Sequence, residues 1–280
     1  MLKKALITCL LFMFTLTSVL AATTVKKTKS PYTTKIVEVT TKDNHIMRAK
    51  LQYQKPPKGV KVTYPTIIML HSLGYCSSQW GALPEELLKL GYAVLMVDLR
   101  GHGISNKDTK FRLKSWTYFT NTTYQKYPSD VLAIINQTKI TNKRVSFSNY
   151  SIIGGDIGAN TAVLVAKKMH PKPKSMVLLT PTVDTKGLTI ATLKGIAPLS
   201  EVGNGPILVM CSQHDKYSIN QEMLLKKFAR GEFIINNVDV NKNGMMIVRN
   251  NEKAMKSVIE FINDNMKPKS SETKNNIKKQ

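Results

Sequence analysis

Apolar residues along the chain follow two patterns, and each pattern predicts one kind of element. Unbroken apolar runs at 66–70 and 92–97 have the length of strands buried on both faces, as in a parallel sheet. Between them, 84–90 has helical spacing and ends at Gly91, a helix stop signal. Further strands are predicted at 34–41, 46–54, 150–155, 175–180, 206–211 and 232–238. Further helices are predicted at 158–169, 219–229 and 251–264.

The order of these elements predicts the fold class. Strands separated by helices imply right-handed crossovers and an α/β fold with a mostly parallel sheet. The last predicted helix places Ala254, Val258 and Ile262 on one face, so it is expected to pack on the sheet. No internal repeat interrupts the pattern, and we expect one domain over 34–265.

The two ends of the chain differ from this domain. Lys3 and Lys4 precede an apolar run over 5–16 and small or apolar residues up to Ala21, a pattern typical of a secretory signal peptide over 1–21. We therefore expect a secreted or periplasmic protein, with an uncleaved anchor as the alternative, although the run is short for a membrane span. Polar, basic residues predict a leader over 22–33 and a Lys-rich, disordered tail over 266–280.

The charge and the cysteines of the chain bear on its possible partners and on a disulfide. The chain has 41 Lys+Arg and 18 Asp+Glu, a formal net charge of +23, which favours contact with polyanions. An anionic envelope polymer or a lipid surface is therefore a possible partner. Nucleic acid is not predicted, because no aromatic residues cluster among the scattered basic ones. Export permits a disulfide between Cys76 and Cys211, but two free thiols are the favoured interpretation.

Metal and cofactor sites are not predicted. Cys211, His214 and Asp215 are the only candidate grouping of metal ligands, and they lack partners at zinc spacing. The glycine-rich segment 154–158 lacks the Lys-Ser/Thr of a phosphate loop and the third glycine of a dinucleotide fingerprint.

Unusual residues follow four of the predicted strands. In an open α/β sheet, ligands bind beyond the carboxyl ends of the strands. The four segments are 71–80, 98–105, 154–160 and 212–218. They are therefore expected to meet at one edge of the sheet, where a small-molecule ligand or substrate is predicted to bind.

Together these segments resemble the α/β-hydrolase family over nearly all of 34–265. The sequence 98–105 (Asp-Leu-Arg-Gly-His-Gly-Ile-Ser) resembles the family's loop after its fourth strand, and 178–181 (Leu-Leu-Thr-Pro) resembles a Leu-Leu-Ser-Pro strand end. Segment 154–158 (Gly-Gly-Asp-Ile-Gly) occupies the place of the nucleophile elbow, G-x-S-x-G. The resemblance implies a sheet of about eight strands flanked by helices, with a short or absent cap between Pro181 and Pro206.

The resemblance also implies roles for individual residues. Ser72 and Leu73 fall in the loop that supplies oxyanion-hole amides, and Ile157 follows the nucleophile position. Asp215 occupies the position of the family's acid, after the strand 206–211. Asn243 stands where the family has its catalytic histidine.

Two departures from the family decide the functional hypotheses. Asp156 replaces the nucleophilic serine, either as a cap of the helix that follows, the favoured interpretation, or as a carboxylate nucleophile like those of haloalkane dehalogenases and epoxide hydrolases. Asn243 has no useful basicity and cannot take a proton from a nucleophile or a water. The usual acyl-transfer machinery is therefore absent.

The five histidines offer few substitutes. His71 ends the strand next to the one that carries Asp156. We favour a role for His71 in ordering the loop with Ser72 and Leu73, here called the oxyanion loop, over a catalytic role. His102 is interpreted as loop structure, and His214 adjoins Asp215 in an orientation that makes a poor partner. His45 and His170 are expected on the solvated surface, away from the strand ends.

Two functions follow from these residues. The first is an exported pseudohydrolase, impaired in catalysis, that binds a ligand or an envelope partner. The alternative is a working hydrolase of esters or related acyl compounds, using a rearranged site around Asp156 with His71 or an activated water.

Overall fold

The computed structural model describes residues 30–266, and a nine-stranded sheet forms its centre. The strand order is β1-β2-β4-β3-β6-β7-β10-β11, with β5 paired to β2. Neighbouring strands from β4 to β11 are parallel, whereas β2 is antiparallel to both β1 and β4. The strands of this sheet are β1 (Tyr32–Thr40), β2 (His45–Gln54), β3 (Tyr64–Leu70), β4 (Ala93–Asp98), β5 (Lys107–Asp108), β6 (Val145–Gly155), β7 (Ser175–Leu179), β10 (Ile207–Met210) and β11 (Phe233–Ile235).

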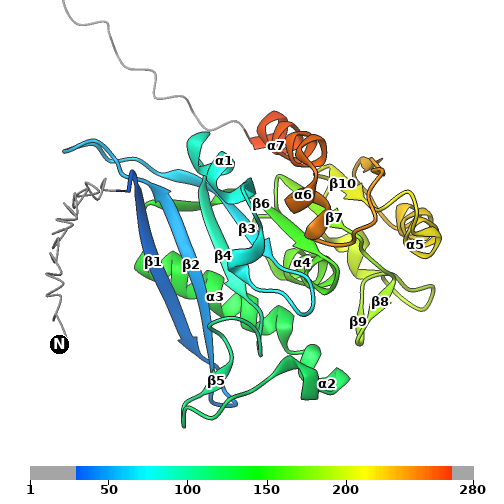
Figure 1. Cartoon of the computed structure of the whole chain (residues 1–280), viewed down its shortest axis with the longest axis horizontal. Helices are drawn as coiled ribbons and strands as arrows, with labels where there is room; N and C mark the ends of the chain where they lie inside the picture. The colour runs from blue at the N-terminus through cyan, green and yellow to red at the C-terminus, as the bar shows by residue number, and fades with distance from the viewer. Residues whose placement is uncertain (1–29, 267–280) are drawn as a thin grey trace, which may run out of the picture. The chain divides into compact units, whose positions relative to one another are not determined.

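Helices cover both faces of the sheet (Figure 1). The helices are α1 (Leu83–Lys89), α2 (Asn121–Tyr124), α3 (Tyr127–Thr141), α4 (Ile157–Lys168), α5 (Lys216–Lys226), α6 (Met246–Asn250) and α7 (Glu252–Met266). One apolar core lies between the sheet and α3 and α4, and the other lies between the sheet and α1, α6 and α7. Ala254, Val258 and Ile262 of α7 are buried in the second core, as the spacing predicts.

Burial explains the apolar runs of the two central strands. Every residue of β3 and of β4 is buried, because each strand has neighbours on both sides and helices on both faces. The prediction of an α/β-hydrolase fold with a mostly parallel sheet is therefore confirmed. The segment between β7 and β10 holds only the two-stranded sheet β8 (Asp184–Thr185) and β9 (Leu188–Thr189) and a 3-10 turn at Pro198–Glu201, which makes a short cap.

Helix α3 and the first half of β6 are absent from the predicted elements. The buried stripe of α3 includes Asp130 and Thr138 beside Val131, Ile134 and Ile135, so polar and β-branched residues conceal its helical spacing. The first half of β6 alternates apolar residues with serine and asparagine and extends the predicted strand back to Val145.

The first and last described elements are β1 and α7, and the predicted domain bounds stay predictions. Strand β1 begins at Tyr32, and α7 ends at Met266. The expected signal peptide, most of the leader and the tail lie outside the described residues. Residues 31–266 cluster as one compact unit. Within 30–266, no helix combines the length and the apolar character needed to cross a membrane.

The backbone of α4 approaches the end of β3 closely, and this contact is directly testable. A Cβ atom on Gly158 would lie 2.2 Å from the carbonyl oxygen of Leu70 and 2.6 Å from that of His71. We expect Gly158→Ala to lower the free energy of unfolding by about 3 kcal/mol, because neither backbone group can move freely. Gly59→Ala is the control: it meets open space, and only its φ of +80° opposes the substitution, at about 1 kcal/mol. Equal losses in chemical denaturation would contradict the close approach.

Candidate functional site

The junction between β6 and α4 has the sharp geometry of a nucleophile elbow. Asp156 has φ 51° and ψ −119°, a backbone conformation that residues other than glycine rarely adopt. Its N–H donates to the carbonyl oxygen of Leu179 at 2.8 Å, and its carbonyl accepts from the N–H of Ala159 at 2.8 Å. A Cβ on Gly154 would lie 2.3 Å from the Gly158 carbonyl oxygen, so the turn requires glycine there. The elbow therefore persists without a serine.

The side chain of Asp156 points to the loop after β3. Its Oδ2 accepts a hydrogen bond from the N–H of Leu73 at 3.2 Å, and the Ile157 N–H also acts on this carboxyl group. Leu73 and Ile157 are two of the three residues that the family resemblance assigns to the oxyanion region, and Ser72 is the third. Asp156 is the N-cap residue of α4 and its carboxyl group lies at the N-terminus of that helix, as the cap interpretation expects, but its side chain makes no capping hydrogen bond. The long-range contact with Leu73 takes its place.

Opposing effects act on the pKa of this carboxyl group. Burial raises the pKa of Asp156, while hydrogen bonds from the Ile157 and Leu73 amides and the charge of Lys186 act in the opposite direction. Lys186 lies in the turn between β8 and β9, so the short cap brings a cation toward the elbow. The net shift favours the protonated, uncharged acid.

Asp215 and Asn243 meet as the aligned positions predict. The Nδ2 of Asn243 donates to Oδ2 of Asp215 at 2.8 Å, the type of contact that a histidine ring N–H makes in a triad. Asp215 precedes α5 and also accepts from the backbone N–H and the hydroxyl of Ser218, at 3.0 and 2.6 Å. Burial acts to raise the pKa of Asp215, but these donors outweigh it and the pKa is lowered. The functional roles of both residues stay predictions.

The segment after Asn243 passes directly beside the elbow. A Cβ on Gly244 would lie 3.2 Å from the Cβ of Asp156 and 2.2 Å from the hydroxyl oxygen of Ser72. The N–H of Met245 donates to that hydroxyl oxygen at 2.9 Å. Ser72 therefore ties the oxyanion loop to the chain that carries Asn243.

Two further contributors are not apparent from the sequence. The hydroxyl oxygen of Thr180 accepts the N–H of Gly244 at 2.9 Å, and the Leu-Leu-Thr-Pro strand end is the only signal that points to it. The sequence does not identify Lys186 as a site residue, because lysines are common in surface loops.

His71 is fully buried, and both of its ring nitrogens are engaged. Nε2 accepts the N–H of Leu99 at 2.9 Å, and Nδ1 therefore donates to the Ser72 carbonyl at 2.8 Å. This neutral tautomer joins the loops after β3 and β4. The ring makes no hydrogen bond with Asp156 in the described structure, which favours loop ordering over catalysis.

His102 is held in the same way. Nε2 accepts the N–H of Gly74 at 3.1 Å, and Nδ1 donates to the Arg100 carbonyl at 3.0 Å. Burial, together with the neighbouring His71 ring, lowers the pKa of His102 to about 3. Burial likewise lowers the pKa of His71.

The remaining histidines lie away from Asp156. The prediction that His45 is solvated is wrong: its ring is buried, with Nε2 2.8 Å from the carbonyl oxygen of Ser105. His170 is exposed, as expected. His214 pairs with Asp239 at 2.6 Å.

A cavity of about 330 Å³ adjoins the oxyanion loop. Gly74 and Tyr75 line one side, while Leu113 and Trp116 line another, with His102 stacked on the Trp116 ring. A space of this size suits a small molecule. Asp156 is not among the residues that line it.

Cysteines and acids do not assemble into a metal centre here. Cys76 and Cys211 are free, and Cys211 is buried. Across the part of the chain that the structure describes, no group of three or more His, Cys, Asp or Glu side chains is placed to hold a metal ion.

Comparison with known proteins agrees with this geometry. A sequence model of the family described as alpha/beta hydrolase fold matches residues 65–201. The parallel sheet, the elbow and the strand-end loops define a protein of the hydrolase class of α/β folds. The chain has the α/β-hydrolase fold. No curated protein sequence matches it significantly.

Solved structures give the same fold at low identity. An acylaminoacyl peptidase of Pyrococcus horikoshii superposes with a TM-score of 0.63 at 16% identity, over 86% of this chain and 43% of that one. An esterase of Pyrococcus furiosus superposes with a TM-score of 0.59 at 18% identity, over 84% of this chain and 92% of that one. A lipase in its open form superposes with a TM-score of 0.62 at 13% identity, over 83% of this chain and 99% of that one. At these identities the likeness shows the fold alone.

The buried neutral histidines predict a pH dependence of stability. The pKa of His102 is about 3 in the folded chain against 6.5 for the free side chain, so between these values the unfolded chain binds a proton that the folded chain does not. We therefore expect the free energy of unfolding to fall as pH drops below 6.5, with a contribution of up to about 1.4 kcal/mol per pH unit from this residue. Denaturant unfolding from pH 7 to pH 4 measures the slope, and His102→Gln should reduce it. An unchanged slope in the variant would assign the effect to other groups.

Proposed function

We propose that the chain is an exported protein of the α/β-hydrolase fold family that binds a small ligand and does not cleave it. The observation that carries the proposal is the hydrogen bond from the Leu73 N–H to the Asp156 carboxyl group. In an acyl transfer that amide would stabilise the negative oxygen of the tetrahedral intermediate. A side-chain oxygen that already accepts the bond competes with the reaction for this donor.

The absence of an available base supports the same function. Asn243 bonds Asp215 but cannot accept a proton. His71 and His102 are buried and use both ring nitrogens on backbone groups. Removing one member of a serine triad costs on the order of 10⁴ to 10⁶ in rate, so we expect ester cleavage near background.

The cavity beside the oxyanion loop is the proposed ligand site. It is lined by aromatic and backbone groups that the neutral histidines hold in place. The pattern of Lys3, Lys4 and the apolar run over 5–16 supports action outside the cytoplasm, after removal of residues 1–21.

One observation favours the alternative of an active hydrolase of esters or related acyl compounds. The charge of Lys186 acts to lower the pKa of Asp156 and so favours the ionised carboxylate that a nucleophile requires. Burial raises the pKa of the same group and outweighs Lys186. The balance supports the binding function.

An esterase assay separates the two functions. We expect purified wild-type protein and its Asp156→Ala variant to show the same background rate on p-nitrophenyl acetate and on an aminoacyl p-nitroanilide, because no group activates the nucleophile. Lys186→Met serves as a second comparison, since it removes the cation and leaves the carboxyl group. Turnover in the wild type that disappears in Asp156→Ala would overturn the binding proposal.

Restoration of the triad tests the assigned positions. The double variant Asp156→Ser/Asn243→His places a hydroxyl at the elbow and an imidazole against Asp215. We expect its esterase rate to exceed that of Asp156→Ser alone by about a hundredfold or more, the range of general-base catalysis. Circular dichroism of both variants checks that they fold. A folded but inert double variant would show that residue 156 or residue 243 is assigned wrongly.

A further inference from the structure

The chain between β4 and α2 leaves the sheet and forms a small hairpin over residues 106–114, here called the basic hairpin. Lys107 bridges Leu113 in antiparallel fashion, and the N–H of Lys114 donates to the Asn106 carbonyl at 2.8 Å. Its first strand, β5, also pairs with the start of β2. Figure 1 shows β5 at the margin of the sheet, beyond the end of β2 that faces α2.

The tip of the basic hairpin is fixed by one buried carboxylate. Oδ1 of Asp108 accepts the backbone N–H groups of Lys110 and Arg112 at 2.9 and 3.0 Å. Oδ2 accepts from Nε of the Arg112 side chain at 2.8 Å. The loop is therefore ordered by polar contacts and needs no apolar core of its own.

The hairpin and the turn after it leave large apolar side chains in solvent. Phe111 is 72% exposed, Leu113 is 68% exposed and Tyr118 is 88% exposed. Phe111 also has a φ of 58°, where a bulky side chain is strained and glycine would be relaxed. Burial within the chain does not explain an aromatic ring that is both strained and exposed, so this ring is a candidate for a contact outside the chain.

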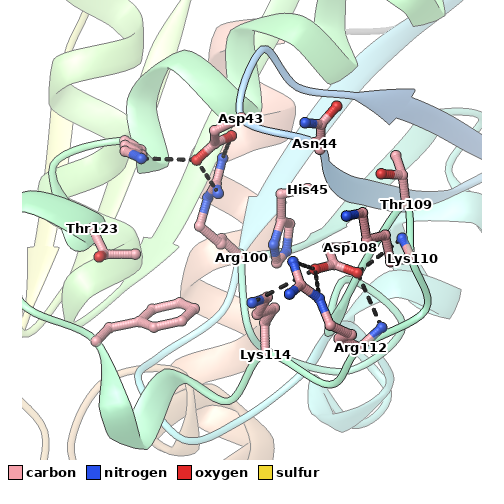
Figure 2. A pocket seen from close by; sticks show the side chains of 12 residues that line it. Asp43, Asn44, His45, Arg100, Asp108, Thr109, Lys110, Arg112, Lys114 and Thr123 are labelled. Atoms are coloured by element: carbon pink, nitrogen blue, oxygen red, sulfur yellow. Dashed lines mark hydrogen bonds and ion pairs between the residues drawn. The ribbon is translucent and has the colours of Figure 1, made fainter.

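Cationic side chains also gather at the basic hairpin. A cavity of about 370 Å³ behind the hairpin is lined by five of them and by only two carboxylates, Asp43 and Asp108 (Figure 2). The cationic lining residues are Arg100, Lys110, Arg112, Lys114 and Lys126.

The lysines of the hairpin supply the unpaired charge. Arg100 is neutralised by Asp43 and Asp130, but the ammonium groups of Lys107 and Lys110 form no ion pair within residues 30–266. Positive charge is therefore available beside the exposed apolar side chains.

We propose that the basic hairpin docks the protein on the surface of an anionic phospholipid bilayer. Phe111, Leu113 and Tyr118 enter the interface between headgroups and acyl chains, and Lys107 and Lys110 meet the lipid phosphates. A soluble anionic polymer would satisfy the lysines but would give no role to the three apolar side chains. Leu113 also lines the cavity beside the oxyanion loop, so the docking surface borders the proposed ligand site, but docking does not require that the ligand be bound or cleaved.

Vesicle sedimentation of the chain without residues 1–21 tests the proposal. We expect binding to phosphatidylcholine vesicles that contain phosphatidylglycerol, and much weaker binding to phosphatidylcholine alone. Phe111→Gly should weaken the binding by tenfold or more through lost apolar burial. The same variant should keep or raise the thermal midpoint, because glycine relaxes the backbone at this position. Lys107→Gln and Lys110→Gln should each cost roughly fivefold.

Matched controls lie near the amino ends of the central parallel strands, whereas the basic hairpin follows the carboxyl end of β4. Ile140, 67% exposed, ends α3 just before β6, and Lys58 and Lys168 are exposed near the start of β3 and at the end of α4. Ile140→Ser, Lys58→Gln and Lys168→Gln should leave vesicle binding unchanged. Failure of the wild type to sediment, or full binding by Phe111→Gly, would overturn the proposal. Binding to soluble polyphosphate but not to vesicles would assign the lysines to a polymer and would overturn it equally.

Discussion

The structure of the site depends on one close backbone contact, between the start of α4 and the end of β3. Because Gly158 has no side chain, the start of the helix packs directly against the carbonyl groups of Leu70 and His71. Gly154 is in the same way close to the carbonyl group of Gly158. This contact holds Asp156 above the sheet, next to the Leu73 amide and the Gly244 backbone. The two glycine contacts do not involve the carboxyl group of Asp156. The backbone geometry of the elbow therefore does not depend on a serine at residue 156.

The loops around the elbow are stabilised in a way that is also independent of catalysis. His71 and His102 use neutral rings to join backbone groups of the loops after β3 and β4. Ser72 and Thr180 hold the chain around Gly244 and Met245 with their hydroxyl groups. A protein with this polar framework can exchange the nucleophile and the base while it preserves the shape of the site.

The sequence predicts those features that local physics dictates. Unbroken apolar runs identify β3 and β4 because burial on both faces leaves no polar position, and the glycine pattern locates the elbow. Helix α3 escapes prediction because the buried Asp130 is compensated by Arg100, which lies 30 residues away in the chain. The burial of His45 depends in the same way on the distant carbonyl of Ser105. The direction of the Asp156 side chain cannot be predicted from the neighbouring sequence either, because its partner Leu73 is 83 residues away in the chain.

The contact between Asn243 and Asp215 has a consequence for the environment in which such a protein works. A histidine at this position would gain or lose charge with the acidity of its surroundings. The carboxamide has no titrating proton in that range, and the donors around Asp215 favour its ionised form. The pair thus keeps a constant charge from mildly acidic to alkaline conditions. The electrostatic field that this pair contributes to the site is therefore the same across that range.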